Sequence, residues 1–343
     1  MANAPGRKNG TKPRPTMSDV AAAAGVSLKT VSRVVNEEPG VRRETAEIVH
    51  RTIAQLGFRR NELARALRHG RRSGLFGLVI EDVSNPFYSA IARGVEEVTR
   101  RRGMLAIAAS SDEDGEREQD IVRLFCERRV DGLLIVPAGD DHGYILPELR
   151  SGTRVVFIDR PPGKIDADVV LLDNVGGARM AVEHLLAQGH RRIGFVGAAP
   201  GIFTTAERLR GYRETLARAG LPADPSLIRL GAHDAAAAEG AVDELLSLPE
   251  PPTALFAGNN RITVGVLRVL GRNGFRLALV GFDDLELGEM LAVPVTVVAY
   301  DAAELGRRAA ELLAQRLAGD DSPPQRVVLP TTLIVRGSGE VKP

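Results

Sequence analysis

Apolar residues from position 75 onward follow two alternating patterns. Short continuous apolar runs, typical of strands buried on both faces of a sheet, are separated by segments in which apolar residues recur every three or four positions, as on one face of a helix. The expected strands are Leu75–Ile80, Leu105–Ala109, Gly132–Val136, Val155–Ile158, Ile193–Val196, Ala254–Ala257 and Leu277–Val280, and the expected helices are Phe87–Arg102, Glu116–Arg128, Gly176–Gln188, Thr205–Ala219 and Arg261–Asn273. This alternation predicts an α/β fold with two doubly wound lobes, each built on a parallel sheet covered by helices on both faces.

The first sixty residues have a different pattern, in which two short helical stretches flank a glycine. Ser18 or Thr16 can cap an alanine-rich first helix. Gly25 allows the positive φ of a tight turn, and Ser27 can cap a second helix that starts at Leu28. The pattern therefore predicts a helix-turn-helix.

The second helix has one apolar and one polar face. Its valines, Val31, Val34 and Val35, recur at helical spacing and can pack on Val20, on Ala23 and on a third helix. The remaining side chains point outward and suit a DNA major groove: Leu28, Lys29, Ser32 and Arg33. The third helix is expected from about Arg42 to Leu56, and the residues expected to close a small core are Ala46, Ile48, Val49, Ile53 and Leu56.

Charge is balanced over the whole chain but not along it. The 343 residues include 45 Lys and Arg and 44 Asp and Glu. Residues 1–74 carry 15 basic and 6 acidic side chains, and residues 75–343 carry 30 basic and 38 acidic ones. A basic head on an acidic body indicates a nucleic-acid binder whose body has another task.

Cysteine content and hydropathy predict a cytoplasmic protein. Cys126 is the single cysteine and cannot form an internal disulfide, and we expect it to be a small buried apolar residue. No apolar run is long enough to span a bilayer, so no membrane partner is expected. Residues 1–15 lack the apolar stretch of a secretory signal and are expected to form a disordered basic arm.

The N-terminal segment resembles the helix-turn-helix of the lactose-repressor (LacI-type) family of bacterial transcription regulators. The resemblance rests on the stretches Asp19-Val20-Ala21, Ala24-Gly25-Val26-Ser27 and Thr30-Val31-Ser32-Arg33-Val34-Val35-Asn36. It covers roughly residues 16–336 and implies a DNA-binding head (16–60), a hinge helix and linker (61–74), a two-lobed effector-binding and dimerisation core of the periplasmic sugar-binding type (75–336) and a tail (337–343).

The resemblance implies a sequence-specific regulator, a repressor, that binds a palindromic operator in double-stranded DNA as a homodimer. A small metabolite, a sugar or sugar derivative, would control it from the cleft between the lobes. Base edges would be contacted by Leu28, Lys29 and Arg33, and phosphates by Thr16, Ser27, Thr30, Ser32 and Asn36. A dimer is expected rather than a tetramer, because the chain ends without a heptad helix after Thr331-Thr332-Leu333-Ile334-Val335-Arg336.

The hinge segment from Asn61 to His69 is shorter than the roughly 12 to 15 residues that an isolated helix needs in water, so we expect it to fold only on operator DNA. By family position, Leu67 wedges a base step in the minor groove and Ala64 faces the partner hinge. The chain departs from the family with Arg60 where proline is common. A plain linker is the alternative.

Polar residues follow the expected strands at the edge where ligands of parallel sheets bind. By family position, Asp159, Arg208, Asn259 and Asp283 would bind ligand hydroxyls. Phe87 and Tyr88 would supply apolar or stacking contacts, and His233 stands where the family often has a stacking aromatic residue. Taken singly, either aspartate could instead cap a loop, Arg208 could form a surface ion pair, and Asn259 could stand in a turn.

Three departures leave the effector unassigned. The pair Asn259-Asn260 replaces the Asn-Asp common in the family, His233 replaces an aromatic residue, and the loop before Leu277 is short. Whether the ligand acts as an inducer or a corepressor is also open, because the family contains both.

Enzymatic function is not expected. The sequence contains no Gly-x-Gly-x-x-Gly after a strand, no Walker-type loop and no His or Cys cluster with metal-ligand spacing, so we expect neither a cofactor nor a metal. Two alternatives are a solute-binding protein without a DNA role, against which the basic head argues, and a regulator controlled by a protein partner on the lobe surface.

Overall fold

The computed structural model describes residues 15–58, 72–274 and 277–343. The chain divides into two compact units, Met1–Ser73 and Gly74–Pro343, which we describe separately. The predictions for Arg60, for the hinge with Ala64 and Leu67, and for most of the N-terminal arm lie outside the described residues and stay predictions.

The first unit contains the helices α1 (Met17–Ala24), α2 (Leu28–Val35) and α3 (Arg43–Leu56). Thr16 caps α1: its Oγ1 accepts from the Asp19 N–H at 3.3 Å, and its own N–H donates to the Asp19 carboxylate at 2.7 Å. Gly25 ends α1 with a φ of 66°, and the Ser27 Oγ caps α2 by accepting from the Thr30 N–H at 3.1 Å. The predicted helix, glycine turn and second helix are therefore present.

The core of this unit is smaller than the apolar pattern predicted. Val20, Ala21, Val31, Val34 and Val49 are buried. Ala23, Ile48 and Leu56, which we expected to pack inside, are exposed. Ile48 lies one position from Val49 and so points about 100° away from it, and Leu56 stands at the last position of α3, beside the terminating Gly57.

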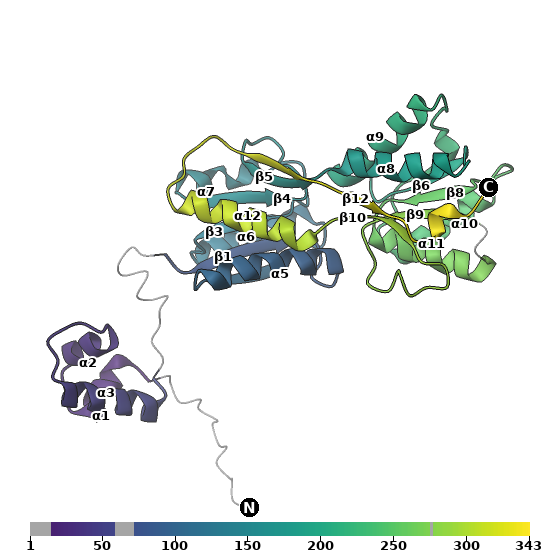
Figure 1. Ribbon diagram of the computed structural model, residues 1–343. Helices are drawn as coiled ribbons and strands as arrows, with labels where there is room; N and C mark the ends of the chain where they lie inside the picture. The colour runs from purple at the N-terminus through teal and green to yellow at the C-terminus, as the bar shows by residue number, and fades with distance from the viewer. Residues whose placement is uncertain (1–14, 59–71, 275–276) are drawn as a thin grey trace, which may run out of the picture. The chain divides into compact units, whose positions relative to one another are not determined.

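The second unit contains two six-stranded sheets, one in each lobe (Figure 1). The first-lobe sheet is parallel throughout, with β11 (Arg326–Leu329), β5 (Asp168–Leu172), β4 (Arg154–Ile158), β3 (Gly132–Ile135), β1 (Leu75–Ile80) and β2 (Leu105–Ser110) in that order. The second-lobe sheet has the order β12 (Thr332–Ile334), β10 (Thr296–Ala299), β9 (Ala278–Phe282), β8 (Ala254–Ala257), β6 (Ile193–Val196) and β7 (Ile228–Arg229). Only the β10 and β12 pair is antiparallel among these described strands.

Helices cover both faces of each sheet, as the continuous apolar strands predicted. The first lobe has α5 (Pro86–Arg101), α6 (Gly115–Glu127), α7 (Leu146–Arg150) and α12 (Ala302–Leu317). The second has α8 (Asn174–Ala187), α9 (Phe203–Arg218), α10 (Ala235–Leu246) and α11 (Asn260–Asn273). Successive residues of β1 serve opposite faces: Leu78 packs in the cluster that includes residues of α5 and α12, and Val79 in the cluster that includes residues of α6.

The helices α5 and α12 cross in very close contact. A Cβ on Gly94 would lie 1.9 Å from the Ala303 carbonyl oxygen, and a Cβ on Gly306 would lie 2.0 Å from the Ile91 carbonyl oxygen. These distances are far below van der Waals contact, so each glycine is required by the backbone of the opposite helix. In Figure 1 the late, yellow-green α12 lies among the early, blue elements of the first lobe.

The chain passes between the lobes three times: from β5 to α8, from β10 to α12, and from β11 to β12. Neither lobe is therefore one continuous segment of sequence. The pattern of apolar runs did not predict β5, β7, β10, β11 or β12, nor the helices α7, α10 and α12.

Residues 337–343, expected as a tail, pack on the second lobe. Ser338 is fully buried: its Oγ donates to the Leu279 carbonyl at 2.6 Å and accepts from the Thr296 N–H at 2.9 Å. The His190 ring lies 2.8 Å from the Val341 carbonyl oxygen. This packing could not be predicted, because short polar segments reveal nothing in sequence about long-range hydrogen bonds.

Two further sequence observations concern hydropathy and the cysteine. No helix within the described residues is both long and apolar enough to cross a lipid bilayer. Cys126 on α6 is half-buried beside the first-lobe core, and burial raises the pKa of its thiol to about 12. It therefore stays a neutral, apolar thiol at physiological pH.

Candidate functional site

A cavity of about 710 Å³ lies between the two lobes of the second unit, at the carboxyl ends of the parallel strands. All seven residues predicted from the sequence to contact an effector line it, which are Phe87, Tyr88, Asp159, Arg208, His233, Asn259 and Asp283. Their common position follows from the topology, because the carboxyl ends of parallel strands meet at one edge of each sheet.

Arg208 is the most firmly held of these side chains. It lies in the second turn of α9, which begins at Phe203, two residues before the predicted start. Its Nε donates to the Asn174 Oδ1 at 2.8 Å, its Nη1 donates to the Gly258 carbonyl at 2.6 Å, and its guanidinium carbon lies 3.7 Å from the centre of the Phe282 ring. The Nη2 edge, 3.9 Å from the Asp283 Oδ1, remains to serve the cavity.

The two aspartates stand at equivalent places in the two lobes. Asp159 directly follows β4 with a φ of 67°, and Asp283 directly follows β9 with a φ of 74°. This left-handed conformation is uncommon for residues other than glycine and turns each carboxylate toward the cavity. Asp283 accepts hydrogen bonds from the Tyr300 hydroxyl at 2.5 Å and from the Asn260 N–H at 3.0 Å.

Asp159 is less well satisfied. Its side chain is buried, and its Oδ1 has no hydrogen-bond partner among the described residues. Burial raises the pKa of this carboxyl, against the opposing effect of Arg160 and Arg208. An unpaired buried carboxylate oxygen is unfavourable unless a ligand donates to it.

The buried Arg160 forms an ion pair with the half-buried Glu113, and the sequence analysis assigned neither residue to the site. The Arg160 Nη1 donates to Glu113 Oε2 at 2.8 Å and to the Pro137 carbonyl at 2.8 Å, and its Nη2 donates to Glu113 Oε1 at 2.5 Å. Arg160 also lies 3.3 Å from the Tyr88 hydroxyl. Arg160 lies two residues after β4, and Tyr300 directly follows β10. Their positions after strands could therefore have identified both as site residues.

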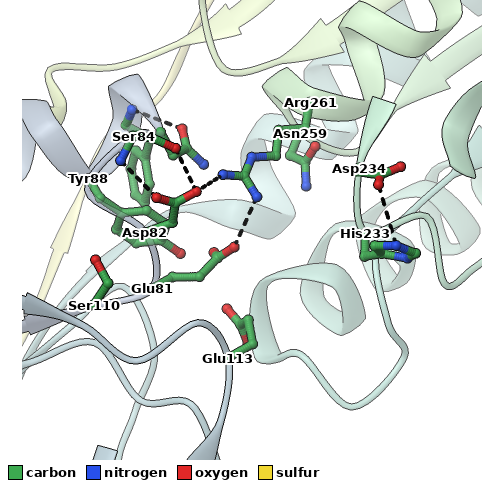
Figure 2. A network of polar contacts seen from close by, with 12 residues as sticks. Glu81, Asp82, Ser84, Tyr88, Ser110, Glu113, His233, Asp234, Asn259 and Arg261 are labelled. Carbon is green, nitrogen blue, oxygen red and sulfur yellow. Dashed lines mark hydrogen bonds and ion pairs between the residues drawn. The ribbon is translucent and has the colours of Figure 1, made fainter. Parts of the chain in front are cut away.

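Polar contacts join the two lobes where α5 and α11 begin (Figure 2). Arg261 pairs with Asp82, and its Nη1 lies 3.5 Å from Glu81 Oε1. The Asn260 amide donates to Asn85 Oδ1 at 2.8 Å. This contact explains the departure at position 260, because an aspartate there could not donate to that oxygen.

His233 lies at the rim of the cavity rather than within it. Its side chain is 80% exposed, and its ring contacts only Gly231 and Asp234 among the described residues, at 3.4 and 3.5 Å. Figure 2 shows it beside Asp234, on the side of the cleft opposite Glu113. It occupies an accessible position from which it could contact a ligand that extends out of the cleft.

A buried network of hydrogen bonds holds together the loops of the first lobe that border the cavity. Glu118 accepts from the Ala138 N–H and from the Tyr144 hydroxyl, both at 2.6 Å, and lies 3.2 Å from the His142 Nε2. The other ring nitrogen of His142 accepts from the Gly163 N–H at 3.1 Å. The network thus joins residue 138 to residue 163, both of which border the cavity.

The head presents its predicted contact residues on and beside α2. Leu28 is 52% exposed, Lys29 is exposed, and Thr30, Ser32 and Arg33 are half-buried. Three polar side chains also have structural roles. Thr16 and Ser27 cap helices, and the Asn36 amide donates to Ser32 Oγ at 3.3 Å and to Glu38 at 3.1 Å.

Comparison with known proteins finds a matching family model for a segment of each unit. Residues 16–61 match the family model "Bacterial regulatory proteins, lacI family", and residues 182–339 match that of the periplasmic binding protein-like domain. The HTH-type transcriptional regulator CelR of Thermobifida fusca is 35% identical over 339 residues, which cover 95% of this chain and 98% of CelR. The chain belongs to the lacI family of bacterial regulatory proteins.

Solved structures of lacI-family proteins agree with this assignment. A transcriptional regulator CelR–cellobiose complex, 33% identical, covers 95% of this chain and 100% of its own with a TM-score of 0.70. A lac repressor dimer bound to operator and the anti-inducer ONPF, 26% identical, covers 95% and 99% with a TM-score of 0.83. This lacI-family chain is thus a DNA-binding transcription regulator, and its relatives are regulators rather than enzymes.

Proposed function

We propose that this lacI-family regulator is a repressor that binds a palindromic operator as a homodimer, and that a carbohydrate in the interlobe cleft changes its affinity for the operator. The observation that carries the proposal is the convergence of Asp159, Arg208 and Asp283 from two lobes on one cavity. A polyol needs several fixed donors and acceptors, and carboxylates and a guanidinium provide them with defined directions.

Apolar side chains complete a sugar-binding arrangement. Phe87 contacts Tyr88 and Tyr300 edge to face, with ring centres 4.8 and 5.9 Å apart, and Phe203 borders the same cavity. Cavities of about 300 to 1,000 Å³ accommodate small ligands, so the volume of about 710 Å³ leaves room for more than one sugar ring. The relative solved with cellobiose supports a saccharide as the ligand class.

The first test is a thermal-shift screen of the full chain against neutral sugars, sugar phosphates, polyols and nucleobases. A ligand at about 100 times its dissociation constant stabilises the native state by about 2.7 kcal/mol, which raises the melting temperature measurably. Each ligand that binds is then added to the chain on DNA fragments from its own upstream region, where we expect a saccharide to change the operator affinity. A saccharide that binds without changing DNA affinity would contradict the proposed control.

Lys29→Ala is expected to change which operator sequences are preferred, rather than to weaken binding to all sequences equally. Lys29 is exposed on α2, where a base-edge contact accounts for about 1 to 3 kcal/mol of discrimination. Binding to a randomised operator library, read by sequencing, measures the preference. Lys342→Ala, in the second unit, serves as the matched loss of one lysine and should leave the preference unchanged; a uniform loss in Lys29→Ala would assign that residue to a phosphate.

Exposed apolar side chains support the homodimer. Leu105 and Ile107 lie on the edge strand β2, and Leu287 and Met290 follow β9. We expect a second copy to cover such residues, because one head reads only half of a palindrome. Light scattering of the full chain should give the mass of two copies, and a stable tetramer would contradict this expectation.

A further inference from the structure

The first-lobe wall of the cleft carries more negative than positive charge. Glu81, Glu113 and Asp159 line the cavity, and Asp82 adjoins them through Arg261. The cations that pair with these four carboxyl groups are Arg160 and Arg261. Arg208, the third guanidinium of the cavity, is engaged with Asn174, Gly258 and Asp283 in the second lobe.

The two guanidinium groups that pair with these carboxylates, Arg160 of the first lobe and Arg261 of the second, are already occupied. Arg160 donates to both oxygens of Glu113 and to the Pro137 carbonyl. Arg261 pairs with Asp82 and lies near Glu81. No lysine is present among the described residues that line the cavity. A phosphate or carboxylate on the ligand would therefore meet carboxylates at this wall, because the free Nη2 edge of Arg208 lies on the second lobe beside Asp283.

One carboxyl group of the wall has an unpaired oxygen, and a second has a raised pKa. Asp159 is 2% exposed, lines the cavity, and has an Oδ1 without any hydrogen-bond partner among the described residues. Burial, and then the negative charge of Glu113, raise the pKa of Glu81 to about 7. Figure 2 shows Glu81 and Glu113 on one side of the cleft, with His233 on the other. Glu81 Oε2 and Asp159 Oδ2 each lie 3.8 Å from the Arg160 guanidinium, so the two carboxyl groups border the same part of the cavity. An ammonium group bound there would donate to the Asp159 Oδ1 and favour the ionised form of Glu81.

We propose that Glu81, Glu113 and Asp159 form a subsite for an ammonium group, and that the effector is an amino sugar or an oligosaccharide that carries a free amine. The inference rests on the proposed function, since it specifies the class of saccharide in the same cleft. An ammonium group has three N–H donors and one positive charge, whereas a sugar hydroxyl in the same place has one donor and no charge. Hydrogen bonds between charged partners are about twice as strong as neutral ones.

The subsite also gives binding a pH dependence with a definite sign. Ammonium binding favours ionised Glu81, so the affinity for the amine should rise as the pH increases through about 7, until the ligand amine itself loses its proton. Below that pH, binding must expel a proton from Glu81. The groups that face Glu81 and set this behaviour are Asp82, Tyr88, Glu113, Arg160 and Arg261.

The experiment is isothermal titration calorimetry of the full chain at pH 7.5 with three matched disaccharides: cellobiose, its analogue with a free amine at each 2-position, and the N-acetylated form of that analogue. Because hydrogen bonds between charged partners are about twice as strong as neutral ones, we expect the free amine to bind about tenfold more tightly than cellobiose. The N-acetylated form should show no such preference, because it has lost the charge.

Two variants assign the preference to the wall. Glu81→Gln should bring the amine to cellobiose affinity ratio close to one, because the amide keeps the shape and removes the charge. Glu116→Gln removes a carboxylate from the exposed start of α6, outside the cavity, and should keep the ratio of the parent chain. If Glu81→Gln fails to fold by circular dichroism, the parent chain is titrated at pH 6.5 in two buffers of different ionisation enthalpy, where only the amine should release protons.

The outcomes separate this inference from the proposed function. If cellobiose binds as tightly as the amine, or if Glu81→Gln leaves the ratio unchanged, the ammonium subsite is wrong and a saccharide effector stands. If a sugar phosphate binds more tightly than all three disaccharides, the charge argument is overturned. If no saccharide binds at all, the proposed function fails together with the inference.

Discussion

Arg208→Met is expected to abolish the response of DNA binding to the effector and to lower the free energy of unfolding by about 3 kcal/mol. The substitution removes the donors to Asn174 and Gly258 and leaves Asp283 buried without its nearby cation. Breaking a buried ion pair costs about 3 to 5 kcal/mol. The lower end applies here, because Tyr300 and Asn260 still donate to Asp283.

Chemical denaturation measures the stability, and operator binding with and without the ligand measures the response. Arg210→Met is the matched control on the same helix, since Arg210 is exposed and pairs with Glu207 and Glu214 at the surface. It should change stability by no more than about 0.5 kcal/mol and keep the response. An Arg208→Met chain that behaves like this control would remove Arg208 from the site.

Gly306→Ala is expected to destabilise the first lobe by more than about 3 kcal/mol, a large effect for one methyl group. The new Cβ would lie 2.0 Å from the Ile91 carbonyl oxygen, and backbone cannot rotate away as a side chain can. The helices α5 and α12 would have to separate, which opens the core that both cover.

A glycine-to-alanine substitution at an open position of a helix should instead raise the free energy of unfolding. Gly271 lies inside α11, and a Cβ there would meet nothing within 4 Å. Gly271→Ala should therefore stabilise the chain by about 0.5 to 1 kcal/mol through the helix preference of alanine. Equal stability of Gly306→Ala and the parent chain in denaturant titrations would show that α5 and α12 do not pack as closely in solution.

The site was predicted mainly from polar residues that follow the carboxyl ends of predicted strands. Asp159, Asn259 and Asp283 follow buried apolar runs, and parallel topology brings such positions together whatever the order of the strands. The position of residues after strands could not predict the pairing of Arg160 with Glu113, because this pairing depends on which loop lies beside β4. The same is true of the contact between Asn85 and Asn260, whose lobes meet only in three dimensions.

Two of the missed strands share a physical cause. β11 and β12 lie at sheet edges, and their side chains alternate between partly buried and exposed. Neither strand is therefore buried on both faces, which is the condition that a continuous apolar run indicates. The head was predicted more accurately, because capping residues and a turn glycine are local signals that do not depend on distant partners.

The three passages between the lobes also affect synthesis. When β5 leaves the ribosome, the first lobe has five of its six strands but lacks α12, which packs on α5, β3, β4 and β5. At the usual rate of about 5 to 20 residues per second, most of the second lobe is made before α12 is complete, over roughly 7 to 29 seconds. During that interval the face of the first-lobe sheet that α5 and α12 share is covered by α5 alone, so part of its apolar surface is exposed. A chaperone would be needed most at this face.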